Sequence, residues 1–170
     1  LPELTKKTLN KDHGLRTGDL GHLDDDGFLY ITGRVKEQYK LENGKYVAPA
    51  PLEEDLKLSP YINQVMIYGL NQTHNVALIV VDMEALSQFA KENSLSEKGS
   101  ALLDHASVRE LYTNEICSQS NNFKTFELIQ NFTLLDEEWT IDNGLLTPTL
   151  KLKRSVVEDH FKNAIASLYP

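Results

Sequence analysis

Two β-prone runs near the start of the chain flank an acidic turn. Residues 16–23 and 28–34 carry Leu, Phe, Tyr and Ile, and the residues between them are Asp-Asp-Asp-Gly. An Asp-Gly turn between two such runs predicts a β-hairpin. Residues 1–15 are polar and are expected to be irregular, whereas the polar residues 35–40 suit a short connector.

The next part of the chain alternates between helix and strand patterns. A turn at residues 42–45 precedes a short helix that Pro49 opens, because proline loses no hydrogen bond in the first turn of a helix. Apolar runs at residues 62–70 and 75–83 then predict two strands. The second run is almost continuously apolar, so this strand should be buried on both faces. Residues 127–135 predict a third strand.

Helical spacing dominates the remaining segments. Ser-x-x-Glu patterns that begin at Ser94, Ser107 and Ser155 match the capping box, which predicts three helix N-termini. Apolar stripes over residues 108–116 and 156–168 predict two amphipathic helices. Residues 136–150 lie between them and should form an ordered loop.

Together these elements predict an α+β fold. Its domain begins at about residue 36 and contains a small, mostly antiparallel sheet flanked by helices. A β-hairpin and a connector that could act as a hinge precede it. A chain of 170 residues is long enough for a real core, because a domain of this size buries roughly two thirds of its unfolded surface.

Composition excludes several classes of protein. The net charge of −8 argues against a general nucleic-acid partner, which would need a basic face. No apolar run approaches the roughly 20 residues of a transmembrane helix. The single cysteine, Cys117, excludes a disulfide scaffold and a thiolate-rich zinc site, and is expected to be a small core residue.

The motifs of common catalytic sites are missing. The acidic turn at residues 24–27 lacks the flanking ligands of a calcium loop, and the five histidines show no metal-ligand spacing, so no metal site is predicted. No P-loop, GxGxxG or GxSxG motif occurs. What remains is a set of charged residues in loops. An aspartate can accept ribose hydroxyls, and Arg and Lys suit phosphate oxygens, but a solvated surface has the same composition.

The order of several motifs resolves that ambiguity. Residues 16–21 read Arg-Thr-Gly-Asp-Leu-Gly, residues 26–29 Asp-Gly-Phe-Leu and residues 33–37 Gly-Arg-Val-Lys-Glu. This series resembles the closing motifs of the adenylate-forming enzymes, which include acyl-CoA synthetases, firefly luciferase and peptide-synthetase adenylation domains. Residues 43–49 (Asn-Gly-Lys-Tyr-Val-Ala-Pro) and 144–154 (Gly-Leu-Leu-Thr-Pro-Thr-Leu-Lys-Leu-Lys-Arg) resemble the long-chain fatty acyl-CoA synthetase branch.

The resemblance implies roles for three residues in the first half-reaction. Asp19 matches the aspartate that holds the ribose hydroxyls of ATP and of the adenylate. Arg34 matches the arginine that contacts the ribose and phosphate region. Lys151 matches the catalytic lysine that bridges the carboxylate and the α-phosphate. Leu150 stands where many members of the family have glycine, a change that the long-chain branch often shows.

Four further residues match the hinge and the second half-reaction. Lys36 falls at the hinge position, within residues 35–38. Lys40 matches a lysine that some members use in thioester formation, although a solvated connector residue is an equal alternative. Gly44 and Lys45 match the segment that lines the pantetheine channel of CoA. Lys153 and Arg154, just after the predicted catalytic lysine, are interpreted as solvated.

The function implied by the resemblance is ATP-dependent ligation of a long-chain fatty acid to CoA. Residues 1–34 would end an N-terminal domain, and residues 39–170 would be a mobile C-terminal domain. The ATP-gripping loop, the glutamate that binds Mg²⁺ and the fatty-acyl tunnel belong to that larger N-terminal domain in the family. The resemblance therefore implies a piece of a longer enzyme, inactive alone, cytoplasmic and free to associate peripherally with membranes.

Two alternatives stay open at this point. The enzyme could adenylate another carboxylate, because the acyl pocket lies upstream. The chain could also be a non-catalytic binding module that kept the fold.

Overall fold

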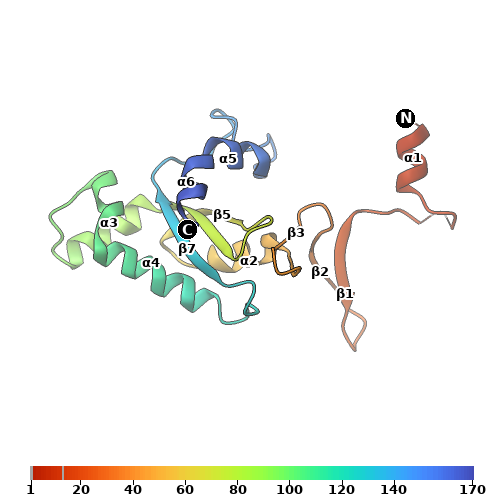
Figure 1. The fold of residues 1–170 in the computed structure, drawn as a ribbon, viewed down its shortest axis with the longest axis horizontal. Helices are drawn as coiled ribbons and strands as arrows, with labels where there is room; N and C mark the ends of the chain where they lie inside the picture. The colour runs from red at the N-terminus through yellow and green to blue at the C-terminus, as the bar shows by residue number, and fades with distance from the viewer. Residues whose placement is uncertain (1, 13) are drawn as a thin grey trace.

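The structure is a computed structural model that describes residues 2–12 and 14–170. It contains an α+β domain with an N-terminal hairpin and a short helix that extend away from it (Figure 1). In chain order the elements are α1 (Pro2–Thr8), β1 (Asp19–Leu23), β2 (Leu29–Arg34), β3 (Tyr39–Lys40), β4 (Tyr46–Val47), α2 (Pro49–Leu56), β5 (Ile62–Tyr68), β6 (Asn75–Val81), α3 (Met83–Glu92), the 3₁₀ helix η1 (Gly99–Asp104), α4 (Ala106–Gln119), β7 (Ile129–Leu135), α5 (Arg154–His160) and α6 (Lys162–Ser167).

The predicted hairpin is confirmed as β1 and β2, which pair antiparallel with a bulge after Leu20. Its turn is closed by the Asp24 carboxylate, which accepts hydrogen bonds from the backbone N–H groups of Asp26 and Phe28. The prediction of an irregular segment over residues 1–15 is wrong for α1. That helix begins at a proline and carries Glu3 in its first turn, and both features favour a helix start without an apolar stripe.

The central sheet has the order β5-β6-β7. The β5 and β6 strands pair antiparallel, whereas β7 pairs parallel with β6. The parallel pairing follows from the connection, because a parallel neighbour needs a long crossover and here α3, η1 and α4 supply it. The two small hairpins and the β5–β6 pair make the strand pairing mostly antiparallel, as predicted.

The sheet separates two hydrophobic cores. All seven residues of β6 are buried, which confirms the prediction for this strand. Its alternate side chains point to opposite faces. Ala77, Ile79 and Val81 pack with α2, α3 and α4, whereas Leu78 and Val80 pack with α5, α6 and the loop before them. Figure 1 shows α3 and α4 on one side of the sheet and α5 and α6 on the other.

The three predicted capping boxes are wrong. Ser94 follows α3 with a left-handed backbone (φ 55°), and Ser107 and Ser155 lie inside the first turns of α4 and α5. The observed cap of α4 is His105, whose Nδ1 accepts a hydrogen bond from the Ser107 N–H. The pattern thus locates the starts of two helices to within two residues but misassigns the capping residue.

Two further expectations need correction. The helix predicted over residues 156–168 is divided at Phe161, whose φ of −100° and ψ of 22° end α5 before α6 begins. The Phe161 ring lies against Trp139 and His160, with centroid separations of 6.4 and 4.6 Å, so packing accompanies the break. Cys117 is exposed rather than part of the core.

The loop of residues 136–150 is ordered, as predicted. The Gln64 side chain accepts a hydrogen bond from the Trp139 N–H and donates one to the Trp139 carbonyl, at 2.7 and 2.9 Å. This pair of bonds holds the loop to β5 and helps to bury Trp139. Within residues 2–12 and 14–170, no helix combines the length and the hydrophobicity that crossing a bilayer demands.

Candidate functional site

A cleft of about 430 Å³ lies between the end of the hairpin and the C-terminal part of the domain. Its walls come from the end of β2, from α2 and β5, and from residues 139–154. Arg34 and Lys151, which are far apart in the sequence, both line it. The structure therefore places two of the residues singled out from the sequence at one site.

Asp19 reaches this site through Arg34. The two residues are cross-strand partners in the register of β1 and β2. The Arg34 Nε donates a hydrogen bond to the Asp19 carboxylate at 2.8 Å, and its Nη2 contacts the Thr17 carbonyl at 3.3 Å. Both side chains remain partly exposed, so the pair contributes little to stability and stays accessible to a ligand.

Lys151 sits in a tightly closed loop. The Thr147 N–H donates to the Lys151 carbonyl at 2.8 Å, and the Lys151 N–H donates to the Thr147 hydroxyl at 3.0 Å. Below this closure, Leu146 pairs with Leu152 in an antiparallel bridge. The backbone at Lys151 is thus held in place, while its side chain is exposed to the cleft's solvent.

The charges around the cleft leave one cation available. Arg34 pairs with Asp19, Lys57 with Glu54, and Arg154 with Glu53. Among the described residues that line the cleft, Lys151 is the cationic side chain with no carboxylate in ion-pair range. A lysine in this state can place its full charge on a ligand phosphate or carboxylate oxygen.

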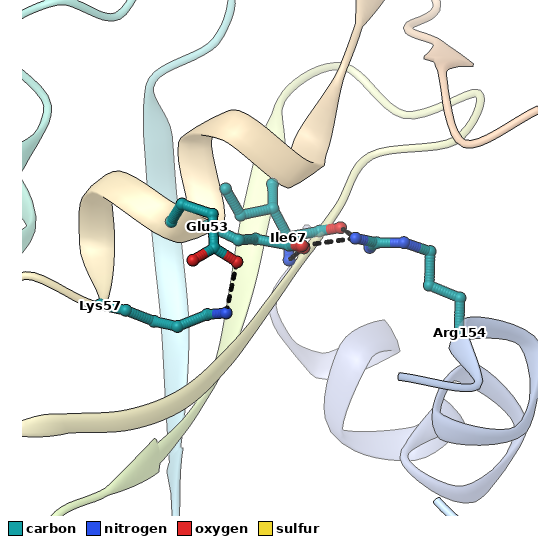
Figure 2. A network of polar contacts seen from close by, with 5 residues as sticks. Glu53, Lys57, Ile67 and Arg154 are labelled. Carbon is teal, nitrogen blue, oxygen red and sulfur yellow. Dashed lines mark hydrogen bonds and ion pairs between the residues drawn. The ribbon is translucent and has the colours of Figure 1, made fainter. Parts of the chain in front are cut away.

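A buried ion pair forms part of the wall and was not expected. Glu53 of α2 pairs with Arg154 at the start of α5, as Figure 2 shows. Glu53 also accepts a hydrogen bond from the Ile67 N–H at 2.7 Å, and Arg154 donates one to the Ile67 carbonyl at 3.2 Å. The interpretation of Arg154 as solvated is therefore wrong. One signal was available in the sequence, because Glu53 lies on the helix face of Leu56, where a charge needs a partner.

The other residues singled out from the sequence lie elsewhere. Lys36 is exposed in the turn that follows β2. Lys40 places its Nζ 6.0 Å from the centroid of the Tyr46 ring, and Lys45 places its Nζ 5.9 Å from that of Phe126. Gly44 occupies the turn between β3 and β4 with a φ of 85°, a conformation that favours glycine.

Within the part of the chain that the structure describes, the residues lining the cleft do not include Lys36, Lys40, Gly44 or Lys45. A second hollow of about 260 Å³ is lined by residues of β2, β4 and α2 and by Lys124, and none of those four candidates, all of them described, lines it either. The candidate residues therefore divide into a group at the cleft, a group in and between β3 and β4, and Lys36 in the connector that follows β2.

The described residues offer no metal site of their own. No three His, Cys, Asp or Glu side chains among them gather closely enough to hold an ion. The magnesium expected with ATP is therefore assigned to none of the residues that the structure describes.

The arrangement of fold and cleft can be compared with known proteins. The family described as the AMP-binding enzyme C-terminal domain matches residues 36–120, which is half of the chain. The chain belongs to this family. The match begins within the connector after the hairpin and ends just after α4, so it covers the α2–β5–β6 framework but not the Lys151 loop.

Curated relatives extend the likeness to nearly the whole chain. A long-chain-fatty-acid–CoA ligase, FadD15 of Mycobacterium tuberculosis, is 39% identical over 161 residues, which are 93% of this chain and 27% of that protein. Human long-chain-fatty-acid–CoA ligase 1 is 33% identical over 171 residues, which are 99% of this chain and 24% of that protein. The chain thus spans about a quarter of the length of these relatives, and its resemblance to the long-chain branch is confirmed.

Solved structures agree on the fold. The adenylation domain of a carboxylate reductase from Mycobacterium chelonae superposes with a TM-score of 0.79 at 25% identity, over 98% of this chain and 25% of that one. A two-domain fragment of the carboxylic acid reductase from Segniliparus rugosus, in complex with AMP, gives a TM-score of 0.71 at 26% identity. The superposition covers 98% of this chain and 22% of that one. The α+β architecture of an adenylate-forming enzyme's C-terminal domain is therefore confirmed.

Proposed function

We propose that this chain is the C-terminal part of an ATP-dependent long-chain fatty acid–CoA ligase. The observation that carries the proposal is the cleft, which Arg34, paired with Asp19, lines together with the unpaired cation of Lys151. Relatives named long-chain-fatty-acid–CoA ligases, at 33–39% identity, support the substrate class.

In the first half-reaction, an oxygen of the fatty carboxylate attacks the α-phosphorus of ATP and pyrophosphate leaves. Negative charge grows on the phosphoryl oxygens as the new bond forms. Lys151 stabilises that charge, because a positioned cation interacts more strongly with the transition state than with the substrates. Asp19 accepts hydrogen bonds from the ribose hydroxyls, and Arg34 contacts the ribose and phosphate region.

In the second half-reaction, the CoA sulfur attacks the acyl carbonyl of the adenylate and AMP leaves. Lys40, Gly44 and Lys45 serve this step, around β3 and β4. Because they lie apart from the cleft, the domain must turn between the two steps. Residues 35–38 act as the hinge, with Lys36 in its exposed turn, so that residues 39–170 move relative to residues 1–34.

The hairpin supports this division of the chain. Its residues Leu23, Phe28, Leu29 and Ile31 are each 60–67% exposed, unlike the apolar residues of the central sheet. A two-stranded hairpin is marginally stable by itself, and a patch of exposed apolar side chains needs cover. We propose that the larger N-terminal domain of the enzyme supplies this cover, together with the sites for ATP, Mg²⁺ and the fatty acid. The 170 residues alone are therefore expected to be inactive.

The test is ATP–pyrophosphate exchange by the full-length protein with fatty acids of graded length. Exchange should depend on a long-chain acid. Lys151→Ala should reduce it by about a hundredfold or more, the usual cost of removing a group that stabilises transition-state charge. Lys153→Ala is the matched control, because Lys153 lies two residues away and is absent from the described lining of the cleft.

Three outcomes would count against the proposal. Exchange that responds only to another kind of carboxylate would favour a different adenylating enzyme, an alternative to which the likeness to carboxylate reductases also points. No exchange with any acid would favour a non-catalytic module. Equal effects of the two lysine substitutions would show that Lys151 is not the catalytic lysine.

A further inference from the structure

The Lys151 loop is attached to the body of the domain at its two ends. At its entrance, Leu146 is buried and its N–H donates a hydrogen bond to the Thr140 carbonyl at 2.9 Å. At its exit stands Arg154, three residues after Lys151. The hydrogen bonds that close the loop join its residues only to one another, so its orientation depends on these attachments.

Arg154 makes the attachment at the exit. One of its guanidinium nitrogens pairs with the Glu53 carboxylate, and another contacts the Ile67 carbonyl at 3.2 Å. Glu53 closes the triangle by accepting from the Ile67 N–H at 2.7 Å. The three residues belong to α2, β5 and α5, as Figure 2 shows, so the exit of the loop is tied to two elements that precede it by about a hundred residues.

Burial makes this attachment rigid. The side chain of Glu53 is 8% exposed and that of Arg154 is 22% exposed. Any arrangement that separates the partners of a buried pair leaves an uncompensated charge, which is strongly destabilising. The pair therefore has few alternative arrangements. A simple surface ion pair would have many, and it would not define the position of a neighbouring loop.

We propose that Glu53 and Arg154 are positioning residues for Lys151. They do not touch the reacting atoms, although both line the cleft. They hold the exit of the loop so that the Lys151 ammonium meets the α-phosphate during adenylation. This inference rests on the proposed function of Lys151, and it predicts that losing the pair impairs the first half-reaction and spares the second.

The variants are chosen to keep the fold. Arg154→Lys retains a positive charge but loses the planar fork that reaches both Glu53 and the Ile67 carbonyl. Glu53→Gln retains an acceptor for the Ile67 N–H and removes the charge. Arg109→Lys is the matched control, because Arg109 also bonds a backbone carbonyl and a neighbouring side chain, those of Phe132 and Asn131, away from the cleft.

The measurements separate the two half-reactions in the full-length protein. ATP–pyrophosphate exchange should fall about 10- to 100-fold in kcat for Arg154→Lys and Glu53→Gln, because a displacement of about 1 Å at a reacting group costs about that much, while KM for ATP should change little. Thioester formation from supplied acyl-adenylate and CoA should stay within about twofold of the wild type. Hydrogen–deuterium exchange should quicken at the Thr147, Leu150 and Lys153 amides, which close the loop.

Each outcome decides a different point. Equal losses in both half-reactions, or an equal loss in Arg109→Lys, would overturn the proposal in favour of a general effect on stability. Unchanged amide exchange in the loop would overturn it directly. A wild-type protein without pyrophosphate exchange would instead refute the proposed function, and faster amide exchange would then leave the pair a merely structural loop anchor.

Discussion

At the scale of single residues, Leu150 adopts a backbone conformation that its side chain disfavours. Its φ is 60°, and the residue is 70% exposed in the loop before Lys151. The left-handed region costs an L-residue roughly 1–2 kcal/mol. The hydrogen bond from its N–H to the Thr147 carbonyl, at 2.9 Å, helps to keep Leu150 there.

Leu150→Gly should therefore stabilise the protein. The strain energy that is relieved exceeds the entropic cost of glycine, whose extra freedom in the unfolded chain costs about 0.4–1 kcal/mol. The free energy of unfolding should therefore rise by about 0.5–1 kcal/mol. Urea unfolding of the 170-residue chain measures this change in the free energy of unfolding. Leu58→Gly is the control, because Leu58 is 72% exposed without a left-handed φ, and it should lose stability. A loss in both variants would mean that Leu150 stores no strain.

At the scale of elements, the caps of the helices depend on which residue the chain brings to each helix start. The start of α3 is capped by Asp82, which directly follows β6. Its carboxylate accepts a hydrogen bond from the Ala85 N–H at 2.8 Å. The Ser-x-x-Glu pattern missed this cap, since Asp82 is not followed by that spacing.

Asp82→Ala should cost about 1 kcal/mol in the free energy of unfolding, because it removes a hydrogen bond to an otherwise unpaired N–H group. Ser107→Ala should change it by less than about 0.5 kcal/mol, because Ser107 lies within α4 and His105 performs the capping. Denaturant titration measures the free energy of unfolding of each variant against the wild type. The reverse order of effects would restore the capping box at Ser107 and contradict the cap at Asp82.

At the scale of the whole molecule, three tyrosine hydroxyls connect elements that are distant in sequence. Tyr39 donates to the Asn75 side chain, Tyr112 to the Tyr61 carbonyl, and Tyr169 contacts the Tyr68 and His74 carbonyls. Burial raises the pKa of all three above the usual 10.0, and the nearby negative charge of Glu53 also raises the pKa of Tyr39. The folded state thus keeps protons that the unfolded state releases.

The sign of the pH dependence follows from this difference. Below about pH 10 both states hold the tyrosine protons and the contribution to stability is complete; above it, the unfolded chain ionises first and stability falls as the pH rises. For the fully buried Tyr112, the expected fall is about 1.4 kcal/mol per pH unit. Between about pH 8 and 11, the free energy of unfolding should fall less steeply with pH in Tyr112→Phe than in the wild type. The exposed Tyr46→Phe is the control, and identical slopes in both variants would contradict the assignment.

Much of the fold could be predicted because its signals are local. The Asp-Gly turn, the prolines at the start of α2 and the continuous apolar run of β6 each act within a few residues, and each appears where expected. The motifs also indicated the family correctly, because their residues and their order can be recognised without knowing any contact. The break at Phe161 was missed because a ring packed against Trp139 has no local signature.

The site divides in the same way. Sequence alone determined the chemical types, an aspartate and an arginine on the hairpin and a lysine in the last loop, together with the family's architecture. Tertiary structure alone decided that Arg34 and Lys151 share a cleft, and that Glu53 meets Arg154 across a separation of 101 residues. The physical reason is the sequence separation over which each interaction acts. Turn motifs and periodic patterns involve residues that are close in sequence, whereas a buried charge meets its partner only when packing brings two distant segments together.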